Sequence, residues 1–479
     1  MSEHTAEHTA DPPAAGGLRG SLGVAGVVFL VVAAASPLVA IGGALPVMMA
    51  IGSGAGAPVS YIAVTVVLLL FSVGYAEMSR HVREAGAFYS YVTAGLGPVL
   101  GTGSAGLALL SYTAVQAAVY GLAGAVLGST VTGFGGPDLP WWVWGGILLA
   151  LVAVLGYRSV DLGIRVLAVL IVLEVGTVAA LAGAVLLRGG ADGLNAVPFT
   201  PGAFLSGSPG IGLMFAVACF IGFEATAVYG QEAREPHRTV PRATYTAVLV
   251  IGGFYTLVSW ALVMAVGAGN ARAAAVDDID GLVFSVAERY AGTPLAAALQ
   301  ILLLTSLFTA LLAFHNTVAR YVYALGGRGG ALAPLGRAHP VHGSPHAASL
   351  AQTCTAAVLI GVFAATGMDP VAQVFTWMSG LATLGVLMLM VLVSIAVVVF
   401  FGRGWRRGRP WRTRVAPILA VVGLVGTVVL VLANFTTLID GSAGLAVMLV
   451  LLLCAAFAVG AVSALSGRTM ETDDSGSVG

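Results

Sequence analysis

Two carboxyl side chains interrupt the long apolar stretches of this 479-residue sequence. Glu174 lies within VLAVLIVLEVGTVAALAG, and Glu224 ends the stretch CFIGFE. Inserting an acid at bilayer depth costs roughly 2.5–3.5 kcal/mol, so each is a functional candidate. A buried carboxyl group can alternate between neutral and charged forms, and can therefore carry a proton. The structural alternatives are a permanently hydrogen-bonded Glu174 and a Glu224 that neutralises the N-terminus of a helix.

Backbone N–H and C=O groups can also bind a ligand where a helix is unwound, and the segment SPLVAIGGALP at 36–46 is suited to unwinding. Pro37 and Pro46 each remove a backbone donor, and the adjacent glycines between them are conformationally permissive. An unwound stretch in hydrocarbon is tolerated only where it lines a cavity or binds something. We expect a second half-helix to start near Gly42 to Leu45, with free N–H groups suited to a carboxylate. The alternative is that the glycines only allow close helix packing.

The apolar stretch 210–229 carries a counterpart, with Gly210 and Gly212 at its start and Gly222 two residues before Glu224. A glycine beside an acid at mid-membrane depth predicts a second discontinuity. The two broken helices are the first and the sixth, five apart, so they would run in opposite directions. That pattern is typical of inverted five-helix repeats with a central binding site.

These residues must be positioned by membrane-spanning helices. The chain is 58% hydrophobic and 9% charged, with a mean hydropathy of +0.97, whereas a soluble domain is typically about a quarter charged. A span needs about 20 apolar residues. The sequence predicts an all-α polytopic membrane protein with about twelve spans, at 22–50, 58–76, 100–130, 141–156, 162–187, 210–229, 243–266, 294–323, 347–367, 371–400, 415–435 and 442–465.

Arginine placement predicts the orientation. All 21 basic residues are arginines, and the net charge of +0 gives no electrostatic basis for nucleic-acid binding. With both termini cytoplasmic, this topology leaves Arg188, Arg272 and Arg289 outside and the other 18 of the 21 inside. Such an excess is the positive-inside bias.

Four segments resemble amino acid permeases of the amino acid–polyamine–organocation superfamily. They are SPLVAIGGALP, EAGAFYSYV at 84–92, GFEATAVYGQEAREPHRTVPRA at 222–243 and HNTVARYVYALGGRGGALAP at 315–334. The resemblance covers roughly residues 20–400. It implies a ten-helix transport core at 21–400, with repeats at about 21–190 and 205–400. Two peripheral helices at 401–465 would follow, with cytoplasmic tails at 1–20 and 466–479.

The resemblance also implies secondary active transport of an amino acid or related amine across the plasma membrane by alternating access. In the family, the glycine motif of helix one binds the substrate carboxylate, and backbone carbonyls around both breaks bind the amine. Carried over, the substrate-binding positions are Ala40, Ile41, Gly42, Gly43, Ala44, Cys219, Phe220 and Gly222. Phe220 and Phe223 flank the second break and could cover the substrate side chain.

Glu174 and Glu224 are the predicted coupling residues, with protons as the coupling ion. Some proton-coupled relatives carry a lysine at about the position of Glu174, where this chain has an acid. The adjacent hydroxyls of Thr305 and Ser306 keep sodium as an alternative, and substrate exchange is a further one.

The sequence gives no sign of a cofactor, a metal site or catalysis. It contains no H-E-x-x-H, no P-loop lysine and no G-x-S-x-G elbow in a loop. A channel would usually show selectivity rings, and a membrane enzyme would depend on the histidines His339, His342 and His346. The identity of the substrate, the direction of transport and the oligomeric state stay open.

Overall fold

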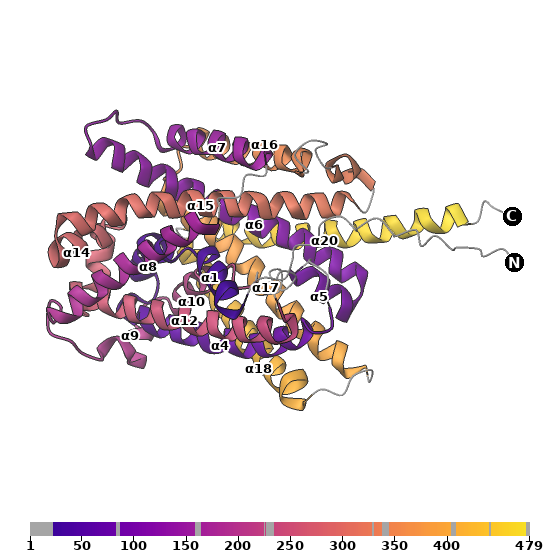
Figure 1. Ribbon diagram of the computed structural model, residues 1–479, viewed down its shortest axis with the longest axis horizontal. Coiled ribbons are helices and arrows are strands. Elements are labelled where there is room, and N and C mark those ends of the chain that lie inside the picture. Colours follow the sequence, from indigo (N-terminus) through magenta and orange to yellow (C-terminus); the bar gives the residue numbers. More distant parts are fainter. Residues whose placement is uncertain are drawn as a thin grey trace, which may run out of the picture.

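The computed structural model describes residues 23–82, 87–158, 164–224, 226, 234–327, 330–337, 344–403, 409–439 and 442–475. The predicted N-terminal tail at 1–20 lies outside these ranges, as do His339 and His342. Within them every regular element is a helix, and several of the longest, such as α15, α12 and α20, run roughly along the long axis of the molecule (Figure 1). The predicted all-α class is confirmed.

Nine helices of the described chain are long and apolar enough to cross a membrane, and three further apolar helices have 10–17 residues. Together they give twelve, the predicted number. The three short ones correspond to the two broken helices and to the short fourth span, at Pro37–Ile51, Pro209–Ala218 and Trp141–Tyr157.

The elements, in chain order, are α1 (Val24–Ala34), α2 (Pro37–Val39), η1 (Ala40–Ala44), α3 (Leu45–Ile51), α4 (Ala57–Met78), α5 (Ala87–Leu96), α6 (Pro98–Gly133), α7 (Trp141–Tyr157), α8 (Ile164–Leu187), α9 (Pro201–Leu205), α10 (Pro209–Ala218), α12 (Pro236–Val266), α13 (Ala271–Asp277), α14 (Leu282–Ala291), α15 (Thr293–Gly326), α16 (His346–Ala365), η6 (Pro370–Phe375), α17 (Thr376–Gly402), η7 (Trp411–Val415), α18 (Ala416–Ala433), α19 (Phe435–Leu438) and α20 (Ala443–Ser475).

The order of elements repeats in the two halves of the core. Each half begins with a broken helix and a long helix, α4 or α12, and then has one or two short helices, α5 or α13 and α14. A very long helix follows, α6 with 36 residues or α15 with 34, and then a short one, α7 with 17 or α16 with 20. The short helices α5 and α14 lie at opposite ends of the helix bundle (Figure 1). This arrangement is that of two inverted five-helix repeats.

The last two spans pack on the outside of this core. Helix α18 contacts α4, α10 and α17, and α20 runs against α6. Many of their apolar side chains face outward, including Val422 and Leu451 with 65% and 60% of their surface exposed. Such a surface suits hydrocarbon rather than water. Helix α20 continues to Ser475, beyond the end at 465 predicted for the last span.

Helices α6 and α20 approach closely because glycines face each other across the contact. A Cβ atom on Gly106 would meet the Ala456 carbonyl oxygen within 2.4 Å, and one on Gly460 would meet the Thr102 carbonyl oxygen equally closely. Small residues that let backbones approach are a common basis of helix association in membranes.

We therefore expect Gly106→Ala to lower the melting temperature of the detergent-purified protein, because the methyl group would push the two backbones apart. Gly426→Ala in α18 is the matched control, since nothing lies within 4 Å of its Cβ position. Replacing glycine by alanine in an open helix position gains up to about 1 kcal/mol in soluble hosts, so the control should melt at or above the wild-type temperature. Equal melting of both variants would contradict the close α6–α20 contact.

Candidate functional site

The first membrane helix is broken at Ser36. Helix α1 ends at Ala34, and Ser36 adopts the left-handed conformation with φ 44° and ψ 72° before Pro37 starts the second half. A residue before proline is disfavoured in the helical conformation, so the chain leaves the helix there. The break thus lies at the first residue of the predicted segment 36–46, and the second half-helix starts at Pro37 rather than near Gly42 to Leu45 as predicted.

Pro46 does not break the helix because a π-helical turn accommodates it. In η1 the Leu45 N–H donates to the Ala40 carbonyl, one residue further back than in an α-helix. The widened turn removes the conflict between the proline and the regular hydrogen-bond ladder. Gly42 and Gly43 lie in this turn and pack closely, since Cβ atoms there would come within 3.1 Å of Leu303 and 2.5 Å of Leu122.

The sixth membrane helix is broken after Ala218, where α10 ends. A non-helical turn follows from Cys219 to Glu224, and Gly222 within it has φ 111°, a value that favours glycine. The break was predicted from this glycine and the acid after it, and it is confirmed. Of the predicted remainder of this helix, residues 225 and 227–229 lie outside the described chain.

The Glu224 side chain folds back over the turn that contains it. One carboxyl oxygen accepts a hydrogen bond from the Gly222 N–H at 2.8 Å, and the other accepts from the Tyr112 hydroxyl of α6 at 2.6 Å. The Tyr75 hydroxyl of α4 donates to the Glu224 carbonyl at 2.7 Å. The side chain is buried. Glu224 therefore fixes the turn and attaches it to two neighbouring helices.

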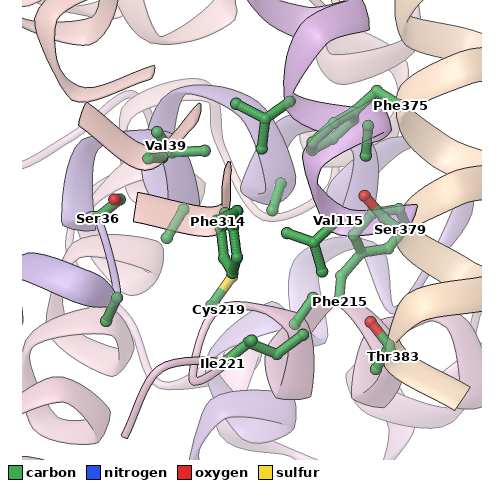
Figure 2. A pocket seen from close by; sticks show the side chains of 17 residues that line it. Ser36, Val39, Val115, Phe215, Cys219, Ile221, Phe314, Phe375, Ser379 and Thr383 are labelled. Carbon is green, nitrogen blue, oxygen red and sulfur yellow. The ribbon is translucent and has the colours of Figure 1, made fainter. Parts of the chain in front are cut away.

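A cavity of about 70 Å³ lies between the two breaks (Figure 2). Its wall is formed by the break in helix one, the end of α10 and parts of α6, α15, η6 and α17. None of the lining residues is charged, and the side-chain polarity is confined to three hydroxyls and one thiol. The lining residues are Ala35, Ser36, Val39, Ala40, Ala44, Val115, Ala118, Val119, Phe215, Ala218, Cys219, Ile221, Ala310, Phe314, Phe375, Ser379 and Thr383.

Three of the predicted substrate-binding residues line this cavity, namely Ala40, Ala44 and Cys219. The cavity wall does not include Ile41, Gly42, Gly43, Phe220, Gly222 or Phe223. Of these, Phe220 packs edge-on against Tyr255 with ring centroids 6.0 Å apart, and Phe223 packs against Phe71 at 5.8 Å.

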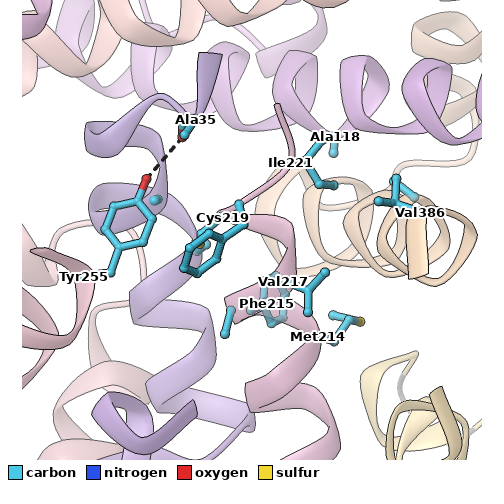
Figure 3. Packing of buried hydrophobic residues seen from close by; sticks show 14 of the residues in the cluster. Ala35, Ala118, Met214, Phe215, Val217, Cys219, Ile221, Tyr255 and Val386 are labelled. Atoms are coloured by element: carbon cyan, nitrogen blue, oxygen red, sulfur yellow. Dashed lines mark hydrogen bonds between the residues drawn. The ribbon is translucent and has the colours of Figure 1, made fainter. Parts of the chain in front are cut away.

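The first break is also tied to a neighbouring helix. The Tyr255 hydroxyl of α12 donates to the Ala35 carbonyl at 3.3 Å, as the dashed line in Figure 3 shows. The Tyr61 hydroxyl of α4 lies 3.5 Å from the Cys219 sulfur at the second break. Each break is thus contacted by a tyrosine from a helix of the opposite half of the core.

Most of the cavity wall was missed by sequence reasoning. Val115, Ala118 and Val119 share one face of α6, and Ala310 and Phe314 share one face of α15, at the spacing of three or four residues expected for a helix. These helices are apolar on nearly every side, however, so periodicity alone does not mark the face that lines a cavity.

Glu174 lies next to this cavity, at a junction of three segments. Its carboxyl group accepts a hydrogen bond from the Ser306 hydroxyl of α15 at 2.9 Å, and it lies close to the backbone of Leu38 in α2, which packs against α8. Leu38 is in the first turn after the break, between the cavity-lining Ser36 and Val39. The acid therefore occupies the N-terminal, partly positive end of the second half-helix. The neighbouring Thr305, which the sequence suggested as part of a sodium site together with Ser306, donates its hydroxyl to the Leu302 carbonyl.

No group of three or more His, Cys, Asp or Glu side chains in the described ranges is arranged to hold a metal ion. The polar chemistry of the site consists of backbone groups at the breaks, hydroxyls and the two acids.

The sequence model of the family described as "Amino acid permease" matches residues 22–457. The chain belongs to this family. Among curated proteins it is similar to the branched-chain amino acid permease BcaP of Lactococcus lactis subsp. cremoris (strain MG1363), with 24% identity over 408 residues. That alignment covers 78% of this chain and 81% of the relative. The predicted resemblance is confirmed, and the chain is a polytopic membrane protein of an amino acid permease family.

We expect Gly222→Ala to impair folding and uptake, because any side chain at φ 111° is strained. A cost on the order of 1–2 kcal/mol is typical for such a conformation. Gly183→Ala in α8, where nothing lies within 4 Å of the Cβ position, controls for the added methyl group. Gly222→Ala should have a lower melting temperature and a lower uptake rate than Gly183→Ala. A wild-type melting temperature for Gly222→Ala would contradict the turn described.

Proposed function

We propose that this permease is a secondary active transporter that moves a neutral amino acid with an apolar side chain across the plasma membrane. The observation that carries the proposal is the cavity between two helix breaks, whose wall is apolar and contains no charged side chain. A cationic or acidic substrate side chain would lose its hydration there without a counter-charge. The name of the lactococcal relative, a branched-chain amino acid permease, points to the same substrate class.

In this proposal the backbone at the breaks receives the charged ends of the amino acid. The N-terminal end of the second half of helix one is partly positive and favours the carboxylate. The carbonyl end of α10, at Ala218 and Cys219, is partly negative and favours the amine. Both ends border the cavity. Among the residues carried over from the family, Ala40, Ala44 and Cys219 are placed to contribute directly, with Ile41, Gly42, Gly43 and Gly222 shaping the backbone behind them.

The apolar part of the substrate would lie against aromatic rings. Phe215, Phe314 and Phe375 come from three different elements and line the cavity together with Val115 and Ile221 (Figure 2). Phe220 and Phe223 lie behind this wall, so we infer that they support the turn rather than cover the substrate side chain.

Alternating access would move the broken helices against a fixed frame. Helices α6, α7, α15 and α16 all pack against one another, and this frame carries one side of the cavity. We propose that it stays comparatively still while the broken helices, α4 and α12 rock. Both termini would be cytoplasmic, as the arginine distribution predicts.

We propose proton coupling through Glu174. Ionised, its carboxyl group accepts a hydrogen bond from Ser306 in the frame and lies close to the backbone of Leu38 at the partly positive end of the moving helix. Protonation removes the negative charge that stabilises the positive helix end, and so weakens this connection. Glu224 makes a comparable connection through Tyr112 and Gly222, and we propose it as a second coupling residue.

The substrate proposal is tested by uptake into proteoliposomes. Radiolabelled valine, leucine, alanine, lysine and glutamate would be supplied with an imposed inward pH gradient and without one. Gradient-dependent uptake of the neutral apolar amino acids and not of the charged ones is the expected result. Uptake that requires a sodium gradient or an internal amino acid would instead identify sodium coupling or exchange.

The same assay locates the site. Ala118→Phe places a ring in the cavity and should lower uptake by at least about tenfold, since even single methylene changes in a binding pocket cost that much. Ala180→Phe on the exposed face of α8 is the matched control and should transport normally. Normal transport by Ala118→Phe would show that the substrate binds elsewhere.

For the coupling, we expect Glu174→Gln to abolish accumulation driven by the pH gradient while exchange of internal for external substrate continues. Glutamine keeps the size and a hydrogen-bond acceptor but cannot release a proton. Glu288→Gln, at an exposed position of α14, should retain gradient-driven uptake. Unchanged accumulation in Glu174→Gln would remove Glu174 from the coupling mechanism and leave the substrate proposal standing.

A further inference from the structure

A second cavity, of about 270 Å³, lies at the end of the bundle predicted to be cytoplasmic. It is formed by the end of α4, the beginning of α12 and the turn η7. Its wall contains four arginines, Arg80, Arg238, Arg242 and Arg412, together with Glu77 and Tyr245. It shares no lining residue with the cavity between the helix breaks.

The charge in this cavity is only partly neutralised. Glu77 is shared between two guanidinium groups, 3.5 Å from Arg80 and 3.6 Å from Arg412. Arg238 pairs with Glu235, but both side chains are at least 65% exposed, and such pairs contribute little. Arg242 has no carboxylate partner within the described part of the chain. Four positive charges therefore face one negative charge in the cavity wall.

The arginines also retain unused hydrogen-bond donors. Arg80 Nε is buried and has no partner among the described residues. The Tyr245 hydroxyl lies in the same wall. Guanidinium groups bind phosphate oxygens through paired, charge-assisted hydrogen bonds, so this set of donors is suited to a phosphate group.

An apolar surface of α4 leads from the cavity toward the middle of the membrane. Ile62 and Val66 are exposed, at 41% and 53%, and they share a helix face with Val73 and Glu77 in the cavity wall, at spacings of four, seven and four residues. On the other side, Trp411 is half-exposed beside Arg412, and tryptophan is typical of the membrane–water interface. The positive cavity thus lies at the inner end of a surface suited to acyl chains.

We propose that this cavity binds the phosphate group of an anionic phospholipid, whose acyl chains lie along the Ile62–Val66 face of α4. Bound there, the headgroup links α4, α12 and η7 at their cytoplasmic ends. A free phosphate ion would satisfy the arginines equally well, but it would leave the apolar face without a role.

The test measures lipid retention by native mass spectrometry of the full-length, delipidated protein. Phosphatidylglycerol and phosphatidylcholine with identical acyl chains would be titrated separately. One phosphatidylglycerol molecule should be retained at a concentration that leaves phosphatidylcholine unbound. Equal retention of both lipids would overturn the proposal. Displacement of phosphatidylglycerol by millimolar inorganic phosphate, without added lipid, would identify a site for the free ion and overturn the lipid assignment.

The double variant Arg242→Gln with Arg412→Gln should bind phosphatidylglycerol roughly 30-fold more weakly, since each arginine near an anionic headgroup contributes on the order of one kcal/mol. The matched control, Arg188→Gln with Arg289→Gln, removes the same charge at the opposite end of the bundle and should retain the lipid. Arg242→Lys with Arg412→Lys should restore most of the binding, which separates a charge effect from misfolding. Unchanged binding in the glutamine variant, or equal loss in the control, would contradict the site.

Discussion

The structure depends on one constraint: a backbone N–H or C=O group in hydrocarbon has no water to bond, so a helix can break there only if protein groups replace what it loses. Both breaks meet this requirement with side chains. Tyr255 donates to the carbonyl of Ala35 at the first break, while Tyr75 donates to the carbonyl of Glu224 at the second. The Glu224 carboxyl group in turn accepts from the Gly222 N–H. The gap that remains between the two breaks is the cavity, and the buried Thr383 hydroxyl in its wall has no hydrogen-bond partner among the described residues.

The same groups decide what can move. Glu174 joins α8 to α15 and lies beside the start of the second half of helix one, and Glu224 joins the turn after α10 to α6. Each acid therefore connects a broken helix to the long helix of the frame that faces it. Hydrogen bonds to an ionised group are about twice as strong as neutral ones, so a change of charge at either position alters how firmly a broken helix is held. This is why the proposal for coupling rests on these two residues and not on exposed acids.

Much of the fold could be predicted from the sequence, because the length of a membrane span is a physical requirement that hydropathy reveals directly. The sequence also predicted two helix breaks. The first lies before Pro37 rather than near Gly42, because the π-helical turn before Leu45 accommodates Pro46 within the helix. The cavity wall could not be predicted. Phe314 and Val115 are ordinary apolar residues on helices that are apolar nearly all round. Nor was the partner of Glu174 visible, because Ser306 lies 132 residues away and only the fold brings them together.

The contact between α20 and α6 has a practical consequence. Glycines on both helices bring the two backbones together, and α6 forms part of the frame around the cavity. The last helix is therefore anchored to the stationary side of the proposed motion, although it lies outside the ten-helix core. A spectroscopic label on the outward face of α20 would serve as a fixed reference point. Distances measured from it to labels on α12 or α4 would then report the motion of those helices alone.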